Sequence, residues 1–299
     1  MRVSKLMPGQ VNRASEVRAA PGGKAAHVAM VLRTLGVDPL WLGFSGGITG
    51  TQLVSGLHAL GIAVQTVNVA QETRVNLEVI DDSGGVTEIL EPGLAIAEKD
   101  WESLFEVCDK LFSEARPGTV IASGSLPSAA EPGCYARLTR LAHQRGHKMF
   151  LDCGGEPMRL ALDAAPDFIK PNREEAEILV GEKIRDSHAA QHAVSKLIRL
   201  GAKSAVVSLG QDGFVWQPAA GQHAYHVHPS NVAVTSSVGC GDATVAAFAY
   251  AVTTGLSATY TLQVAAACGA ANCLADLPGR LREADIKNLL PQVRIEKLA

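Results

Sequence analysis

The sequence predicts an α/β protein in which a doubly wound, mainly parallel sheet is flanked by helices and carries a small β-sheet lid. The centre and the C-terminal half alternate short apolar runs with amphipathic segments, which is the pattern of βαβ units. The chain has 299 residues and a hydrophobic content of 47%, which is enough to bury a large core. Two segments of the first third lack this alternation and indicate strands without helices between them.

The elements of the main sheet follow from these patterns. Five short apolar runs are expected to be strands: Leu40–Phe44, Thr119–Ser123, Lys148–Cys153, Phe168–Lys170 and Ala205–Leu209. Amphipathic helices are expected at Ala25–Leu35, Lys99–Ala115, Pro132–Arg145 and Ser187–Leu200. Because parallel strands need crossover connections, these helices should cover the two faces of the sheet.

The lid is predicted from two segments, Val11–Ala19 and Ile62–Leu90, which look like strands without intervening helices. Within Arg74–Val79, polar and apolar residues alternate, so one face of this strand should be polar and the other apolar. The run Asp81–Gly85 then supplies a hairpin turn. We expect one domain over residues 1–299, with lid strands from about 11–19 and 62–90.

A long uncharged stretch, Ala243 to Ala275, must be weighed as a membrane span because it contains no Asp, Glu, Lys or Arg. Its alanine and threonine content and the break at Gly255-Leu256-Ser257 favour two buried helices instead. The N-terminus lacks the apolar core of a signal peptide, so the expected location is the cytoplasm.

Charge and cysteine content exclude some classes of protein. The formal net charge is -3 and no stripe of Lys or Arg is present, so nucleic acid is not an expected partner. The six cysteines contain no CxxC pair, which suits reduced thiols in a large cytosolic protein better than a disulfide framework.

The strongest local signal is the run Ser236-Ser237-Val238-Gly239-Cys240-Gly241-Asp242, which leads directly into an alanine-rich helix. Two glycines at a helix start allow backbone N–H groups to converge on an anion, and the helix dipole adds positive charge there. A carboxylate at the edge of such a turn can accept a proton from an attacking hydroxyl group. A tight turn with Asp242 as the helix cap explains the run equally well.

Two further strand ends carry possible ligand-binding residues. The chain contains neither a GxxxxGK[ST] loop nor a GxGxxG fingerprint, so the commonest phosphate-binding designs are excluded. The run Lys170–Glu175 follows a predicted strand and places Asn172 and Glu175 near the sheet edge, although a helix cap accounts for it as well. The run Ser208–Gly213 ends another strand in a glycine turn, or forms a hairpin into Phe214–Gln217.

Glycines and histidines elsewhere are less specific. The run Pro21–Lys24 precedes a predicted helix and allows the backbone to approach a ligand, as does Ser123–Pro127 after its strand. His27 is placed to contact a substrate, but a cap or a solvent position is as good an explanation. A metal site at His223, His226 and His228 is not expected, because no Cys or carboxylate accompanies them at ligand spacing.

Taken together, these motifs resemble those of the PfkB carbohydrate kinases of the ribokinase-like superfamily. The resemblance runs from about Gly9 to Leu290 and is closest to the 1-phosphofructokinase and tagatose-6-phosphate kinase group. The motifs that carry it are Pro21-Gly22-Gly23-Lys24, Gly43-Phe44-Ser45-Gly46-Gly47, Thr73-Arg74-Val75-Asn76, Ser123-Gly124-Ser125-Leu126-Pro127 and Lys170-Pro171-Asn172.

The resemblance implies a ribokinase-like fold and a role for each matching residue. Asp242 would be the general base, and the amides of Gly239, Cys240 and Gly241 would form the anion hole. Asn172 and Glu175 would stand near the triphosphate of ATP, with Glu175 holding Mg²⁺ through water. The nucleotide site would be completed by Ser208, Gly210, Gly213 and Asn272. The sugar site would comprise Gly22, Gly23, His27, Arg74, Asn76 and Ser125, with Arg74 and Ser125 on an existing phosphate.

The first functional hypothesis is therefore a kinase that moves the γ-phosphoryl group of ATP, with Mg²⁺, to a hydroxyl group of a sugar phosphate. The acceptor class comprises fructose 1-phosphate, fructose 6-phosphate and tagatose 6-phosphate, and the resemblance suggests a homodimer formed through the lid. The alternative is a nucleotide-binding regulatory or scaffold protein. It is suggested by His27 and Ala25, which replace an Asn and a Gly of the family motif, and by the family's first strand, which has no counterpart here.

Overall fold

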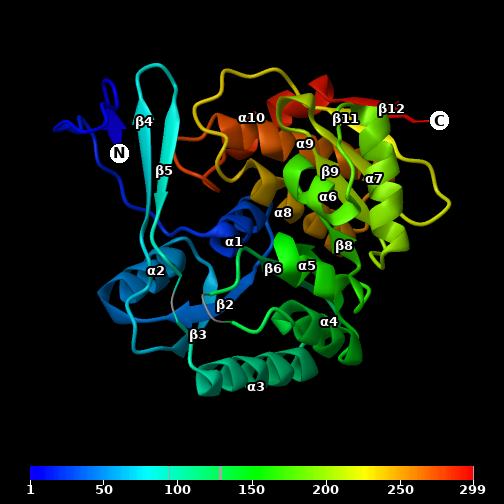
Figure 1. Cartoon of the computed structure of the whole chain (residues 1–299), viewed down its shortest axis with the longest axis horizontal. Helices are drawn as coiled ribbons and strands as arrows, with labels where there is room; N and C mark the ends of the chain where they lie inside the picture. Colours follow the sequence, from blue (N-terminus) through cyan, green and yellow to red (C-terminus); the bar gives the residue numbers. More distant parts are fainter. Residues whose placement is uncertain (94, 128–129, 299) are drawn as a thin grey trace.

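The computed structural model describes residues 1–93, 95–127 and 130–298. Within them, the main sheet has the strand order β12-β11-β10-β9-β8-β7-β6 (Figure 1). The parallel strands are β6 (Thr119–Ser123), β7 (Lys148–Asp152), β8 (Phe168–Ile169) and β9 (Ala205–Ser208). An antiparallel extension contains β10 (Phe214–Gln217), β11 (Tyr225–His228) and β12 (Arg294–Lys297). Four of the five strands predicted for the main sheet are confirmed, whereas the fifth, Leu40–Phe44, is a strand but belongs to a separate sheet.

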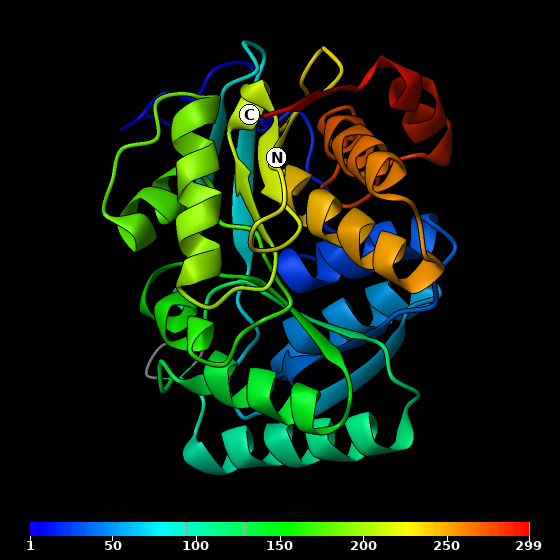
Figure 2. The same ribbon diagram turned by 90° about the vertical axis from the view of Figure 1, so that its right-hand side faces the viewer.

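Helices cover both faces of this sheet, as the doubly wound prediction requires (Figure 2). One layer contains α1 (Lys24–Thr34), α8 (Cys240–Thr254), α9 (Ala258–Cys273) and α10 (Glu283–Leu289). The opposite layer contains α4 (Cys134–Gln144), α5 (Gly155–Leu162), α6 (Arg173–Val180) and α7 (Ser187–Arg199). Short 3₁₀ turns lie at Gly210–Asp212 and Leu290–Gln292. Each layer buries its own apolar cluster against the sheet.

A separate two-stranded sheet pairs β2 (Leu40–Ser45) in parallel with β3 (Ala63–Asn68), and α2 (Gly47–Ala59) connects them. The strands predicted between Ile62 and Leu90 are present without a helix between them, but β3 belongs to this sheet rather than to the lid. The sequence did not predict helix α2, because the helix contains three glycines and glycine is a poor helix former. Two of them have a packing reason: a Cβ on Gly50 would lie 2.6 Å from Ser45 Oγ, and one on Gly56 would lie 2.5 Å from Pro21 Cγ.

The two sheets are not joined by hydrogen bonds in the described residues, so β2 and β6 each present an edge without a strand partner. Helix α1 packs against both strands and bridges the two sheets. Helix α3 (Glu98–Glu114) also links the two parts, because it packs on β3 and on α4.

The lid is a three-stranded sheet of β1 (Arg2–Val3), β4 (Asn76–Asp81) and β5 (Val86–Leu90). The hairpin between β4 and β5 is confirmed, but the expected strand at Val11–Ala19 was wrong. Only Glu16 of that segment makes a β-bridge, to Arg2. Its apolar side chains find no core, since Val11 is 80% and Val17 63% exposed. Without burial, an alternating pattern gives little stability to a strand.

The uncharged stretch near the C-terminus forms α8 and α9, which pack against each other and against the sheet. Their buried faces are mostly alanine, which allows the two helix backbones to approach closely. None of the described helices combines the length and the apolar character that a membrane crossing demands. The prediction of two buried helices is confirmed.

Candidate active site

The glycine turn lies where α8 begins, next to the carboxyl ends of β6, β7 and β8. Gly239 is the residue before the helix and has a φ of 83°, a left-handed conformation that favours glycine. No side chain caps this helix start. The Cys240 amide donates a long bond of 3.3 Å to Ser237 O. Apart from this long bond, the N–H groups at the start of α8 have no side-chain cap in the described residues, so they are available to an anion.

Asp242 is not the cap of this helix, which removes the structural alternative to a chemical role. It is the third residue of α8, 4% exposed, and its carboxylate is bonded to a side chain rather than to a backbone amide. Its Oδ2 lies 2.8 Å from Nδ1 of His27, a buried residue of α1. The cap and solvent explanations for His27 were therefore wrong. Within the described residues, no hydrogen bond is found for the second carboxylate oxygen or for His27 Nε2.

A buried carboxylate with two lysines lies beside this pair. Asp152, at the end of β7, is 1% exposed on its side chain, with Lys170 Nζ at 3.2 Å and Lys24 Nζ at 3.4 Å. Ser123 Oγ adds a hydrogen bond of 3.2 Å. Burial alone would raise the pKa of Asp152, but the two ammonium groups outweigh it and hold the pKa below its usual range. Lys24 is affected in the opposite sense: burial lowers its pKa, while Asp152, Asp242 and Glu175 together raise it above the usual value.

Lys170 also borders the glycine turn. A Cβ on Gly241 would lie 2.9 Å from Lys170 Nζ, so the glycine leaves room for the ammonium group. Its side chain is only 4% exposed. A fixed positive charge therefore reinforces the partial charges of the helix start, in an environment where water screens little.

The predicted residues after β8 form a complete capping box. Asn172 Oδ1 accepts the amide of Glu175, and Glu175 Oε2 accepts the amide of Asn172, each at 2.9 Å. The helix-cap explanation is thus correct for α6, and it leaves Glu175 Oε1 beside Gly154, where a Cβ would lie only 2.9 Å away. A free carboxylate oxygen suits a hard cation such as Mg²⁺. The contact of Asn172 and Glu175 with the triphosphate and Mg²⁺ stays a prediction.

The predicted nucleotide residues of the next strand lie close to this box. Ser208 ends β9 and forms a β-bridge with Asn172. Gly210 and Gly213 flank the following 3₁₀ turn with φ values of 66° and 84°, and this turn closes the hairpin into β10. A Cβ on Gly213 would lie 1.9 Å from Val227 O, whereas Gly210 faces open space. Gly210 is thus the residue of this turn whose backbone a ligand can approach.

Asn272 holds the glycine turn through hydrogen bonds and does not face open space. It is 1% exposed, and its Nδ2 donates to Val238 O at 2.7 Å while its Oδ1 accepts the amide of Gly279 at 2.8 Å. Both ends of the amide are therefore occupied by backbone groups. A direct contact of Asn272 with a nucleotide stays a prediction, and its position indicates a role in holding the turn.

The predicted sugar residues come from α1, β6 and the lid. Gly22 and Gly23 are exposed just before α1, and Gly23 has a φ of 93°. Asn76 faces the same side of the lid as Glu78, whose pKa is raised by burial and by Glu88 and is lowered by the nearby His27. The polar face of β4 therefore looks toward α1, as expected. Arg74 and Ser125 are exposed, and their contact with a sugar phosphate stays a prediction.

Three residues of this site were missed by the sequence reasoning: Asp152, Lys170 as a charged group, and Glu78. A signal existed for the first two, because each follows a buried strand at the sheet edge where α/β proteins bind ligands. No signal existed for Glu78, since its place near His27 depends on how the lid folds back.

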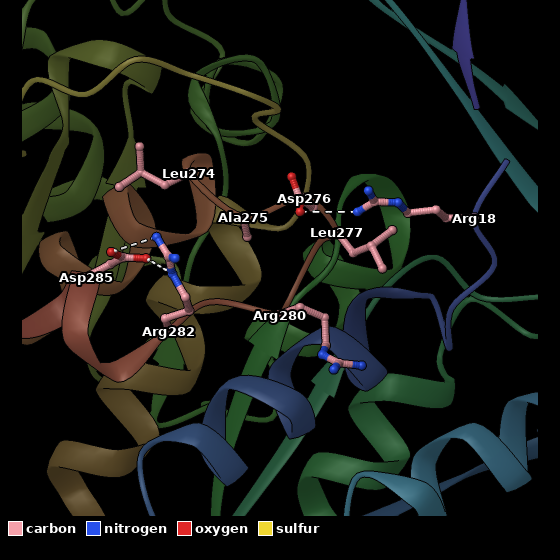
Figure 3. A pocket seen from close by; sticks show the side chains of 8 residues that line it. All are labelled: Arg18, Leu274, Ala275, Asp276, Leu277, Arg280, Arg282 and Asp285. Carbon is pink, nitrogen blue, oxygen red and sulfur yellow. Dashed lines mark hydrogen bonds and ion pairs between the residues drawn. The ribbon is translucent and has the colours of Figure 1, made fainter. Parts of the chain in front are cut away.

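Two other polar features lie outside this cluster. A hollow of about 410 Å³ is formed by the segment after α9 and by Arg18, which pairs with Asp276 at 3.2 Å (Figure 3). On β11, His226 and His228 come together with Glu296 of β12, with possible ligand atoms within 4.8 Å of one another. The strand pairing supplies the carboxylate that the sequence spacing of the histidines did not reveal.

Comparisons with known proteins agree with this geometry. A family model described as "pfkB family carbohydrate kinase" matches residues 1–280. The 1-phosphofructokinase of Escherichia coli K12 is 34% identical over 263 residues, covering 88% of this chain and 83% of that protein. The 1-phosphofructokinase of Borreliella burgdorferi is 30% identical over 279 residues, covering 93% and 88%. The solved structure of phosphofructokinase-2 from E. coli with substrates and products has a TM-score of 0.89 at 27% identity, covering 97% of this chain and 94% of that one.

Proposed function

The chain belongs to the PfkB family of carbohydrate kinases, and from this premise we propose that it transfers the γ-phosphoryl group of ATP to a hydroxyl group of fructose 1-phosphate. It is a sugar kinase, a phosphotransferase with an alcohol group as acceptor. The identity of the acceptor rests on the relatives named 1-phosphofructokinase. The observation that carries the chemistry is the buried Asp242 carboxylate at the edge of the glycine turn.

In the proposed reaction, the sugar hydroxyl oxygen attacks the γ-phosphorus, and the bond from that phosphorus to the bridging oxygen of ADP breaks. Asp242 accepts the hydroxyl proton on the oxygen that His27 leaves available. The amides of Gly239, Cys240 and Gly241, with Lys170 beside them, stabilise the charge on the transferred group. Glu175 would hold Mg²⁺ through water, and the ion would neutralise charge on the phosphate oxygens.

A homodimer formed through the lid is part of this proposal. Val75 and Ile89 are 50% and 57% exposed, and Ile89 shares its face of the hairpin with Leu77. This apolar face is turned away from the polar face of β4. A second copy of the chain fits such a surface, because the two hairpins are identical and a two-fold axis makes them self-complementary. Sedimentation velocity measures the mass and decides between monomer and dimer.

The alternative of a nucleotide-binding regulatory protein is not favoured. The catalytic turn, the buried carboxylate and the surrounding lysines are all present in one cluster. The replacement of the family's Asn by His27 leaves a hydrogen-bonding group on Asp242 rather than a gap.

An assay of ADP release tests the proposed function. The protein is mixed with MgATP and, in separate reactions, with fructose 1-phosphate, fructose 6-phosphate, tagatose 6-phosphate and free fructose. We expect the highest kcat/KM with fructose 1-phosphate. A higher value with fructose 6-phosphate or tagatose 6-phosphate would correct the acceptor, and no sugar-dependent ADP release with any of them would refute the kinase activity.

A further inference from the structure

The last turn of α9 holds the glycine turn of the active site in place. Thr235 donates its amide to Cys273 O at 2.7 Å, and Asn272 Nδ2 donates to Val238 O at 2.7 Å. A third contact joins two thiols: Cys240 Sγ lies 3.0 Å from Cys273 Sγ. The catalytic turn and the helix end are therefore already held together at three points.

We infer that Cys240 and Cys273 form an oxidative modification site, at which a hydroperoxide converts the two thiols into a disulfide and thereby inactivates the kinase. The inactivation rests on the proposed function, since Cys240 belongs to the turn assigned there to phosphoryl transfer. The disulfide itself rests only on the position of the two sulfur atoms.

The geometry requires only a small movement. A disulfide bond is about 2.05 Å long, so the two sulfur atoms, now 3.0 Å apart, must approach by about 1 Å. Cys240 stands between Gly239 and Gly241, whose backbone is the most adaptable available. Cys273 is the last residue of α9, where a helix frays most easily. The strain of closing the bond is therefore absorbed by these two flexible positions.

Accessibility distinguishes this pair from the remaining cysteines. Cys240 and Cys273 are partly exposed, whereas the other four are buried: Cys108, Cys134, Cys153 and Cys268. Leu274 and Ala275, which follow Cys273 directly, line the hollow of Figure 3, so solvent reaches this end of the helix. A small oxidant can therefore reach the pair without unfolding the protein.

The chemistry balances with one hydroperoxide per disulfide. The hydrogen bond between the two thiols lowers the pKa of Cys273 and raises that of Cys240. Cys273 also lies at the helix end that solvent reaches, so we take its thiolate as the nucleophile. The Cys273 thiolate attacks an oxygen of hydrogen peroxide and the O–O bond breaks, which gives a sulfenic acid and a hydroxide ion that takes a proton from solvent to become water. Cys240 sulfur then attacks the sulfenic sulfur, its proton leaves with the hydroxyl group as a second water, and the S–S bond forms.

The disulfide should act on catalysis through the turn. Cys240 supplies one of the proposed anion-hole amides, and Asp242 follows only two residues later. Pulling Cys240 toward α9 moves its amide away from the position that the transferred phosphoryl group needs. Backbone N–H donors stabilise a developing charge only at short, well-defined distances. We therefore expect full oxidation to lower kcat at least tenfold, as the loss of an anion-hole donor does.

The test uses the full chain, treated with hydrogen peroxide and then with an alkylating reagent. In the wild type we expect a product that is lighter by two hydrogen atoms before alkylation, and afterwards a disulfide-linked peptide pair containing Cys240 and Cys273. The kcat should fall with oxidation and recover with dithiothreitol. The kcat of Cys273→Ser, compared with that of its own untreated sample, should resist the peroxide. The variant Cys108→Ser, in which a buried thiol is removed from α3, should be inactivated like the wild type.

The outcomes separate this inference from the proposed function. A linked peptide pair in a protein without activity toward any sugar would leave the disulfide standing and refute the kinase reaction. Absence of the linked pair, or inactivation of Cys273→Ser at the wild-type rate, would overturn the inference even if the kinase activity is fully established.

Discussion

At the scale of single residues, the proposed proton acceptor is one buried carboxylate, that of Asp242. Asp242→Asn keeps the size of the side chain and a partner for His27 but removes the basic oxygen. We expect kcat to fall by about two to four orders of magnitude, while the KM for ATP changes little. Steady-state kinetics with the best acceptor sugar measures both. A variant with near-normal turnover would show that Asp242 is not the base.

The lid residue Arg74 is expected to read a phosphate already present on the acceptor. Its guanidinium group can pair with phosphate oxygens in a bidentate, charge-assisted way. Arg74→Ala should raise the KM for the sugar phosphate at least about tenfold, which corresponds to about 1.4 kcal/mol, with little effect on ATP. Arg116→Ala, at an exposed position just after α3, is the matched control. An equal loss with free fructose would show that Arg74 does not read the phosphate.

The buried Asp152 makes stability depend on pH. Asp152→Asn leaves Lys170 buried without its counter-charge, which should cost about 3–5 kcal/mol of unfolding free energy at pH 7. Because the folded pKa of Asp152 is depressed, its contribution is complete above the unfolded pKa of about 3.9 and is lost as pH falls through the folded value. The difference between wild type and variant should therefore shrink below about pH 4.

Urea unfolding at a series of pH values measures this difference. Asp109→Asn is the control, since Asp109 forms an exposed pair with Arg145 and should lose much less stability. If the wild type and Asp152→Asn keep the same difference at every pH, the carboxylate is not the source of the stabilisation.

The sequence indicates those candidate site residues that lie close together within one short segment of the chain. The turn from Gly239 to Asp242 and the run from Lys170 to Glu175 were both found, because each combines glycine or a cap with a charged residue at a strand or helix end. The partnership of Lys24 with Asp152 spans 128 positions of the chain, and that of His27 with Asp242 spans 215. Pairings of this length are set by the fold and leave no local pattern.

At the scale of elements, the start of α8 is shaped by a glycine that leaves room for a lysine. Gly241→Ala adds a methyl group 2.9 Å from Lys170 Nζ, so the ammonium group must move away from the turn. Alanine is a good helix former, so the folded state should not suffer from helix propensity. We expect kcat to drop at least about tenfold, equivalent to about 1.4 kcal/mol in the barrier.

Gly118→Ala provides the comparison for this variant. A Cβ at Gly118 would lie 3.6 Å from Arg116 O, an ordinary contact, and the position is far from the glycine turn in the chain. Its kcat should equal that of the wild type. Normal kcat in Gly241→Ala would show that Lys170 does not act at this turn.

The sequence predicted helices and strands most accurately where a segment is buried and also shows the apolar periodicity of its element. The strands β6, β7, β8 and β9 are apolar runs buried in the sheet, and their bounds agree with the prediction within two residues. The helix α2 was missed because glycines at close-packed positions mask its period. The segment from Val11 to Ala19 was predicted to be a strand because its apolar and polar residues alternate. That alternation does not show whether a hydrophobic core is available to bury the apolar side chains.

At the scale of the whole molecule, the sheet is divided between β2 and β6. Each strand is hydrogen-bonded on one side only in the described part of the chain, whereas β8 lies between β7 and β9. Amide groups without a strand partner exchange hydrogen quickly unless other packing protects them. We expect fast exchange for about half of the amides of β2 and β6, and slow exchange throughout β8.

Hydrogen exchange read by NMR or by mass spectrometry of short peptides measures this contrast. The interior strand β8 is the internal control, since it shares solvent conditions and global stability with β6. Equal protection of β6 and β8 would show that the edge of β6 is covered in solution.

The packing of α1 on α8 also fixes the order in which this protein can mature during synthesis. Helix α1 is made early, yet Val28, Val31 and Leu32 belong to the same buried cluster as α8, which leaves the ribosome about 200 residues later. Domains are synthesised from the N-terminus at about 5–20 residues per second. The apolar face of α1 therefore stays without α8 to pack against for many seconds. The hydrogen bond between His27 and Asp242 can form only after α8 has been synthesised. A nascent chain that stops before α8 therefore exposes the apolar face of α1 and lacks the proposed base, so we expect chaperones to bind it.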